Sequence, residues 1–138
     1  MKSKHICVLG AGLMGVGIAT HFARYGHDVW LYDTDSSRIA EISGVAGGIL
    51  DELIVTDQFA IGEKATVVAR LHGTTSLQDI AACRLLIEAI PERLELKHAL
   101  YAQLEELIAP EAVIASNTSG LPPDALAEKL AHPERLLI

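Results

Sequence analysis

The 138-residue sequence is poor in basic residues, aromatic residues, cysteine and long apolar runs, and these shortages exclude several classes of protein. Eleven Lys and Arg residues stand against 18 Asp and Glu residues, which gives a formal net charge of -7 at pH 7. Proteins that bind nucleic acid mainly through its phosphates usually have a basic face. The charge balance therefore argues against a nucleic-acid partner.

No apolar run approaches the roughly 20 residues that a membrane-spanning helix needs, and the apolar stretch after Met1–Lys4 is too short for a secretory signal. The two cysteines, Cys7 and Cys83, both lie in apolar stretches. This usage favours a reducing compartment over a disulfide scaffold. We therefore expect a cytoplasmic protein with no membrane partner.

What the sequence does contain is a regular alternation of predicted strands and helices. Short apolar runs bounded by turn residues predict strands at 5–9, 28–32, 71–75, 84–89, 112–115 and 135–138. Helical patterns lie between them, and the longest covers 92–109. This alternation predicts an α/β fold of the Rossmann type, with a doubly wound, mostly parallel sheet and one domain over residues 1–138.

The second helical region, from Thr34 onward, contains three glycines, Gly44, Gly47 and Gly48. Glycine costs about 1 kcal/mol relative to alanine at an interior helix position. We therefore predict a break or hinge here, followed by separate helical pieces at 49–55 and 65–71.

The clearest functional motif is Gly10-Ala11-Gly12-Leu13-Met14-Gly15, a GxGxxG sequence between a predicted strand and a predicted helix. Gly10 permits a tight turn, Gly12 lets the backbone approach a pyrophosphate, and Gly15 lets the helix pack closely on the strand. The helix N-terminus supplies unpaired N–H groups to the phosphates of a dinucleotide. The competing interpretation is a tight turn without a ligand.

Asp33 ends the second predicted strand, 21 positions after Gly12. Its carboxylate can accept hydrogen bonds from the ribose hydroxyls of a dinucleotide and would repel a 2′-phosphate. Asp35 adds a second negative charge, and the first basic residue beyond it is Arg38. These features favour NAD over NADP as the cofactor, and FAD is the competing dinucleotide.

Three motifs together resemble a known family. Residues 8–19, residues 87–92 with Lys97, and residues 115–119 resemble the NAD-binding domain of the L-3-hydroxyacyl-CoA dehydrogenases, including the 3-hydroxybutyryl-CoA dehydrogenases. The L-gulonate and carnitine dehydrogenases share much of this plan. The resemblance implies oxidation of (S)-3-hydroxyacyl-CoA to 3-oxoacyl-CoA in fatty acid metabolism, with NAD as hydride acceptor.

The resemblance also implies the site. Ser119 matches a serine that faces both cofactor and acyl-CoA, and it is the predicted catalytic residue. The predicted cofactor-binding residues are Gly10, Gly12, Leu13, Met14, Gly15, Asp33, Ala89, Glu92, Lys97, Asn117 and Ser119. No metal site is predicted, because the six histidines are scattered without ligand spacing.

Other interpretations of these residues remain open at this point. Glu92 and Lys97 could form a solvated pair on a helix surface, and Ser119 could bond the backbone of its own turn. Glu88 ends a buried strand, and charged groups are rarely buried alone. It could line the site or act as a partner for nearby backbone.

The sequence also departs from the family pattern. The family's catalytic histidine lies in a His-Phe-x-Asn-Pro-like segment beyond the position of Ile138, and its helical C-terminal domain, which forms the dimer, lies further on. We therefore expect these 138 residues alone to lack the base, which typically contributes about 10²–10⁴-fold to the rate. A non-catalytic NAD-binding module is the alternative function. The interrupted helix shows no clear residues for the CoA tail.

Overall fold

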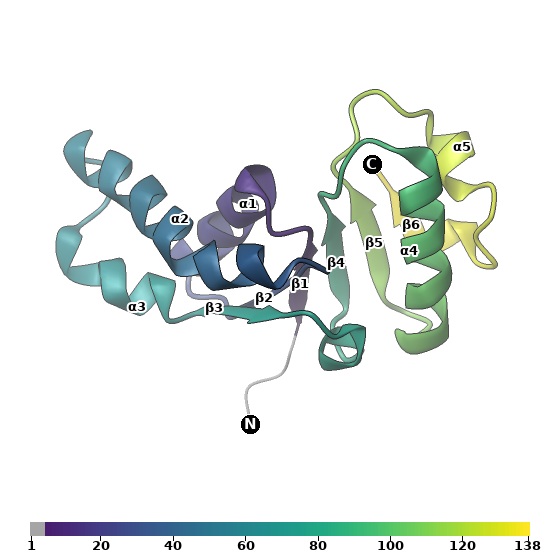
Figure 1. Ribbon diagram of the computed structural model, residues 1–138, viewed down its shortest axis with the longest axis horizontal. Coiled ribbons are helices and arrows are strands. Elements are labelled where there is room, and N and C mark those ends of the chain that lie inside the picture. Colours follow the sequence, from purple (N-terminus) through teal and green to yellow (C-terminus); the bar gives the residue numbers. More distant parts are fainter. Residues whose placement is uncertain (1–4) are drawn as a thin grey trace.

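Six parallel strands form the centre of the structure, a computed structural model that describes residues 5–138 (Figure 1). The segment Met1–Lys4 considered above lies outside the described residues. The sheet has the strand order β3-β2-β1-β4-β5-β6, which confirms the predicted doubly wound Rossmann-type fold. The strands are β1 (Ile6–Leu9), β2 (Val29–Tyr32), β3 (Leu71–Thr74), β4 (Leu85–Glu88), β5 (Val113–Ser116) and β6 (Leu136–Leu137).

Helices connect the strands. They are α1 (Leu13–Arg24), α2 (Ser36–Val55), α3 (Lys64–Val68), α4 (Leu94–Leu107) and α5 (Pro123–Ala127), with 3-10 turns at Ile61–Glu63, Leu77–Ile80 and Pro133–Arg135. Helix α5 is followed by a turn in which Leu130 N–H donates to the Ala127 carbonyl. Within residues 5–138 no helix combines the length and apolarity needed to cross a membrane.

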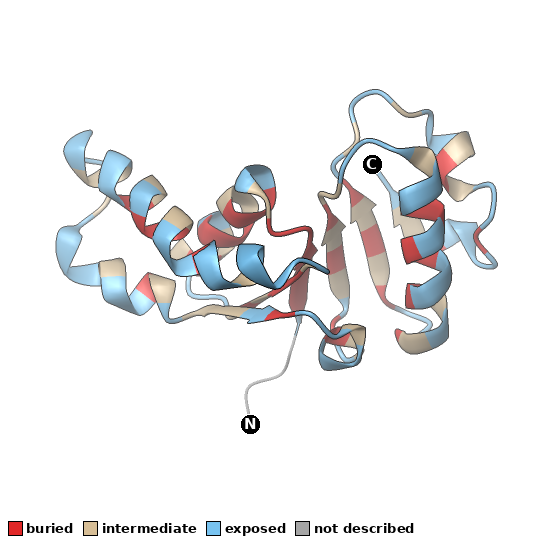
Figure 2. Cartoon of the chain, viewed as in Figure 1, coloured by how far each residue is buried: buried red, intermediate tan, exposed pale blue. Residues whose placement is uncertain are grey.

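Side chains of the strands alternate between two cores, one on each face of the sheet. In β1, Ile6 and Val8 join the core under α1 and α2, whereas Cys7 and Leu9 join the core under α4. Figure 2 shows the buried residues along the strands and on the inward sides of the helices. A sheet covered on both faces explains the nearly continuous apolar runs of its strands.

Helix α2 is continuous, so the predicted break at Gly44 to Gly48 is wrong. One side of the helix is buried through Ile42, Ala46 and Leu50, and this packing outweighs the cost of the glycines. A Cβ at Gly47 would meet Cε of Lys64 at 3.5 Å, an ordinary van der Waals contact, so packing does not require glycine there. In Figure 1, α2 and α3 form a helical hairpin that projects beyond the sheet.

Parallel register brings four loops to one edge of the sheet. Leu9 pairs with Tyr32 and Glu88, and Glu88 pairs with Ser116. The residues that follow these strand ends are Gly10, Asp33, Ala89 and Asn117, which therefore lie in a row. From β1 the chain adds β2 and β3 on one side of the sheet and then adds β4, β5 and β6 on the other side. Doubly wound sheets bind ligands at this switch point between β1 and β4.

Candidate functional site

The turn after β1 requires glycine at two of its positions. Gly10 has φ +104°, and a Cβ on it would lie 2.7 Å from the carbonyl oxygen of Ala89. A Cβ on Gly15 would overlap the carbonyl oxygen of Gly10. The tight turn predicted at Gly10 and the close helix–strand packing predicted at Gly15 are both confirmed.

The N-terminus of α1 is open to a ligand. Its N-cap is Gly12, its first turn has no acidic residue, and no side chain of the described residues caps it. Leu13 and Met14 are 76% and 62% exposed. A Cβ on Gly12 would have only Arg38 Nη1 nearby, at 3.6 Å. Unpaired N–H groups and a partial positive charge at this helix end suit the diphosphate of a dinucleotide.

Asp33 follows β2 and is held by two backbone groups. Its Oδ2 accepts a hydrogen bond from Ala11 N–H at 2.9 Å, and its Oδ1 accepts one from Asp35 N–H at 2.9 Å. Each carboxylate oxygen can still accept a further bond. Arg38 Nη1 lies 3.7 Å from Oδ2, and the Arg38 side chain is 49% exposed. The carboxylate is thus already oriented beside the glycine turn, where it can accept bonds from ribose hydroxyls.

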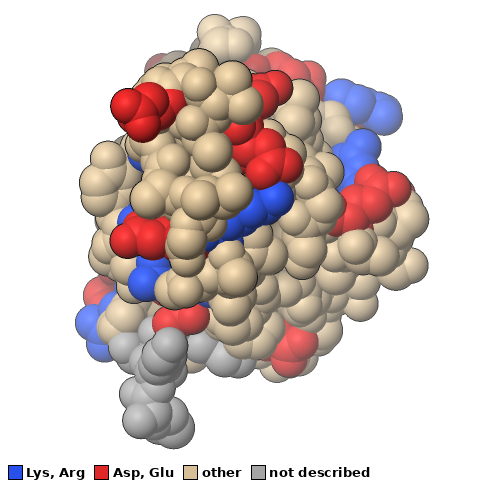
Figure 3. Space-filling view, turned by 90° about the vertical axis from the view of Figure 1, so that its left-hand side faces the viewer, with Lys and Arg blue, Asp and Glu red and all other residues tan. Residues whose placement is uncertain are grey.

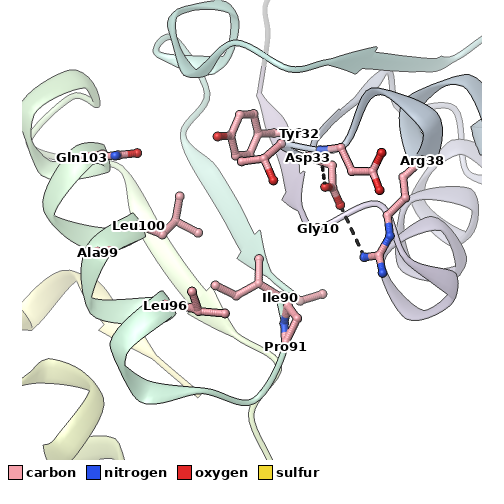
Figure 4. Close-up of a pocket in the computed structure, with 13 residues that line it drawn as sticks. Gly10, Tyr32, Asp33, Arg38, Ile90, Pro91, Leu96, Ala99, Leu100 and Gln103 are labelled. Carbon is pink, nitrogen blue, oxygen red and sulfur yellow. Dashed lines mark hydrogen bonds and ion pairs between the residues drawn. The ribbon is translucent and has the colours of Figure 1, made fainter.

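A cleft of about 380 Å³ opens between Asp33 and helix α4 (Figure 4). Polar groups of the loop after β2 form one side, and apolar side chains of α4 and of the loop after β4 form the other. This combination suits an adenosine group, whose base is flat and whose ribose is polar. The lining residues are Gly10, Tyr32, Asp33, Thr34, Asp35, Arg38, Ala89, Ile90, Pro91, Leu96, Ala99, Leu100 and Gln103.

The α4 side of this cleft was missed by the sequence analysis. No motif pointed to Leu96, which is 40% exposed and lines the cleft. The available signal was its place in the first turn of the helix, close after Pro91 and therefore beside the loop of β4.

Lys97 is buried, so the interpretation of Glu92 and Lys97 as a solvated surface pair is wrong. The Lys97 side chain is 2% exposed, and its Nζ lies 2.7 Å from Glu92 Oε1 and 3.1 Å from Glu88 Oε2. The two carboxylates hold the ammonium group between β4 and α4.

Glu92 holds the loop that follows β5. Its carboxylate accepts hydrogen bonds from the Thr118 hydroxyl at 2.7 Å, Ser119 N–H at 3.1 Å and Gly120 N–H at 3.3 Å. The bond from Lys97, followed by those from the loop, lowers the pKa of Glu92 to about 2. Glu92 is therefore an anion at neutral pH.

Glu88 is fully buried and accepts hydrogen bonds from two side chains and from one nearby backbone N–H, and the last of these agrees with the second interpretation left open above. Its Oε1 accepts bonds from the hydroxyls of Tyr101 and Ser116, both at 2.7 Å. Its Oε2 accepts a bond from Ile90 N–H at 3.1 Å. Burial, and then the bond to Glu88, raise the pKa of the Tyr101 hydroxyl, which stays protonated. No motif pointed to Tyr101.

The structure gathers the predicted site residues into two neighbouring groups. The first surrounds the glycine turn and consists of Gly10, Gly12, Leu13, Met14, Gly15, Asp33 and Ala89. The second lies on the loops after β4 and β5 and consists of Glu92, Lys97, Asn117 and Ser119, of which Asn117 and Ser119 are exposed. In the turn that contains Ser119, the Thr118 hydroxyl accepts a hydrogen bond from the backbone N–H of Leu121 at 3.1 Å.

The remaining chemistry of the described residues is limited. Within residues 5–138, no three His, Cys, Asp or Glu side chains lie close enough to hold a metal ion. Cys7 and Cys83 are buried thiols, and burial raises the pKa of Cys7, which makes it a poor nucleophile. On the face shown in Figure 3, acidic and basic side chains are intermixed.

Comparison with known proteins identifies the family of the chain. Residues 5–138 match the family described as 3-hydroxyacyl-CoA dehydrogenase, NAD binding domain. A probable 3-hydroxybutyryl-CoA dehydrogenase of Deinococcus radiodurans is 38% identical over 94% of this chain and 46% of its own length. The L-carnitine dehydrogenase/betainyl-CoA thioesterase of Agrobacterium fabrum is 32% identical over 96% of this chain and 27% of its own length.

A solved structure shows the same fold. The crystal structure of 3-hydroxybutyryl-CoA dehydrogenase from Escherichia coli K12 superposes with a TM-score of 0.88 at 33% identity, over 99% of this chain and 29% of that chain. The chain thus spans less than half the length of these relatives. The family match covers both motif loops and the whole sheet. The chain belongs to the 3-hydroxyacyl-CoA dehydrogenase family and forms its NAD-binding domain.

Proposed function

We propose that this domain serves an enzyme that oxidises (S)-3-hydroxyacyl-CoA to 3-oxoacyl-CoA with NAD as hydride acceptor. The observation that carries the proposal is the Asp33 carboxylate, fixed by Ala11 N–H beside the open N-terminus of α1. This pairing of a diphosphate site with a ribose acceptor is what NAD requires. The acyl-CoA substrate is supported by the names of the relatives.

In this proposal, each part of the site binds one part of the dinucleotide. The Asp33 carboxylate accepts hydrogen bonds from the hydroxyls of the adenosine ribose, and the backbone N–H groups of Leu13 and Met14 face the diphosphate. Leu96 and Leu100 cover the adenine from the α4 side, and Ala89 lies between the two halves. When bound, NAD supplies the nicotinamide ring that takes up a hydride.

The nicotinamide half belongs to the loops after β4 and β5 in this proposal. Asn117 and Ser119 are exposed there, and Glu92, held by Lys97, orients their loop. The Ser119 hydroxyl can donate to a substrate oxygen as the catalytic residue predicted from the resemblance. The base that takes the hydroxyl proton would be the histidine of the family's His-Phe-x-Asn-Pro-like segment.

We also propose that the protein carrying this domain is a cytoplasmic homodimer. The dimer is implied by the family's helical C-terminal domain. Two buried thiols, which form no disulfide among the described residues, support a reducing compartment.

The test uses the gene region that encodes this chain, expressed together with whatever coding sequence follows the Ile138 codon. NADH formation is followed with (S)-3-hydroxybutyryl-CoA, L-gulonate and L-carnitine as substrates. Turnover with the acyl-CoA is the expected result. Turnover with L-carnitine alone would favour the activity named for the Agrobacterium relative. NADH binding without turnover on any substrate would favour a non-catalytic NAD-binding module.

A further inference from the structure

Three charged side chains form a chain of contacts from the sheet to the loop after β5. Glu88 contacts Lys97 at 3.1 Å, and Lys97 contacts Glu92 at 2.7 Å. The side chains of Glu88 and Lys97 are 0% and 2% exposed. Glu92 then binds the loop through the backbone N–H groups of Ser119 and Gly120.

The net stability of the fold does not explain such a buried pair. Removing two charges from water costs about as much as their attraction returns, and apolar side chains of similar size are often equally stable in that place. A buried network of this kind can instead select one arrangement of the groups that it joins. The arrangement selected here is that of the loop at 117–120.

The inner end of the network is firmly held. Besides Lys97, Glu88 has three hydrogen-bond donors, which are the hydroxyls of Tyr101 and Ser116 and the N–H of Ile90. Tyr101 lies one helical turn after Lys97 on α4, so both side chains reach the same carboxylate. The position of the Lys97 ammonium is therefore set by β4, β5 and α4 together.

The outer end of the network lies away from the adenosine site. Asp33 follows β2, whereas the loop held by Glu92 follows β5, and β1 and β4 lie between them in the sheet. The inner end has one link to the adenosine cleft, because Ile90, which donates to Glu88, lines that cleft. This bond needs only one oxygen acceptor, which the amide oxygen of a glutamine also supplies. A disturbance of Lys97 and Glu92 should therefore act mainly on the nicotinamide half of a bound dinucleotide.

We propose that Glu88 and Tyr101 are positioning residues for the nicotinamide half of the site. They fix Lys97, Lys97 fixes Glu92, and Glu92 fixes the backbone of Ser119 and Gly120. This inference rests on the proposed NAD site, and it adds two residues that do not touch the cofactor.

The test compares two ligands that share the adenosine diphosphate. NADH carries the nicotinamide ring, and ADP-ribose lacks it. The variants are Glu88→Gln, which keeps the shape but removes the charge, and Tyr101→Phe, which removes one hydroxyl. Tyr25→Phe is the matched control, because Tyr25 is exposed and lies outside the network. Affinities come from calorimetry, and amide hydrogen exchange by NMR reports on Ser119 and Gly120 without any ligand.

Glu88→Gln should weaken the binding of NADH about tenfold and the binding of ADP-ribose less than about twofold. Tyr101→Phe should weaken NADH about threefold with ADP-ribose unchanged. Both should speed amide exchange at Ser119 and Gly120, and Tyr25→Phe should change nothing.

Equal losses for the two ligands, or unchanged exchange at Ser119 and Gly120, would overturn the inference. If Glu88→Gln does not fold, Tyr101→Phe decides alone. If the unaltered chain binds neither ligand, the proposed NAD site fails, and faster exchange in the variants would still show that the network holds the loop.

Discussion

The Asp33 carboxylate accepts a hydrogen bond from the Ala11 backbone N–H at 2.9 Å, which ties the end of β2 to the glycine turn after β1. The proposed ribose acceptor and the proposed diphosphate site are therefore held in a fixed relation before any ligand arrives. Binding to such a preorganised site loses little conformational entropy.

Replacing Asp33 with Ala should weaken NADH by about tenfold to a hundredfold, because a charged acceptor of hydrogen bonds is lost. NADPH should lose less, since the same change also removes the repulsion of its 2′-phosphate. Calorimetric titration of both ligands measures the two losses. Asp51→Ala is the charge-matched control, because Asp51 pairs with Lys64 on the surface of the α2–α3 hairpin. Equal losses of NADH and NADPH would show that Asp33 does not distinguish the 2′ position.

Replacing Arg38 with Gln should weaken the binding of NADPH about threefold more than the binding of NADH. The guanidinium lies 3.7 Å from Asp33 Oδ2 and lines the same cleft, so it offsets part of the repulsion that a 2′-phosphate meets there. Competition of each nucleotide against a fluorescent NADH analogue measures the change. Arg84→Gln, on an exposed pair with Glu111, is the control. A larger loss for NADH would assign Arg38 to a group that the two nucleotides share.

Replacing Gly44 with Ala should stabilise the fold by about 0.5–1 kcal/mol, because the helix continues through this position and a Cβ meets open space. Replacing Gly10 with Ala should destabilise it by at least about 2 kcal/mol, since φ is +104° and the Cβ would strike Ala89. Urea unfolding monitored by circular dichroism measures both changes. A loss of stability in Gly44→Ala would mean that α2 is interrupted there after all.

Replacing Glu92 with Gln should reduce stability at neutral pH and have little effect near pH 2. The pKa of Glu92 is about 2 in the folded protein and ordinarily 4.5, so the unfolded chain takes up the proton first as the pH falls. The contribution of this carboxylate is thus complete above pH 4.5 and is lost as the pH falls toward about 2. Unfolding measured across this range compares the variant with the unaltered chain. If the difference in free energy of unfolding between the variant and the unaltered chain stays constant down to pH 2, the bonds assigned to Glu92 are wrong.

The parts that were predictable from the sequence are those set by local pattern. The GxGxxG turn, its helix and Asp33 follow one another within a single βαβ unit, so their spacing alone placed them at one edge of the sheet. The alternation of strand and helix likewise predicted the doubly wound fold, because right-handed crossovers leave few other arrangements.

The parts that were not predictable depend on contacts between distant segments. The burial of Lys97 is set by Glu88 on β4 and by Glu92 on the loop before α4, and spacing along the helix carries no sign of it. The continuity of α2 depends on its packing against α1 and β3, which overrides the low helix propensity of its glycines.

A crystal structure of the chain with bound NADH would locate each part of the dinucleotide on the proposed site. We expect the adenine in the cleft between Asp33 and Leu96, the adenosine ribose on the Asp33 carboxylate, and the diphosphate at the N-terminus of α1. This expectation would be contradicted by crystals grown at millimolar NADH whose cleft stays free of nucleotide, or by a ribose bound away from Asp33.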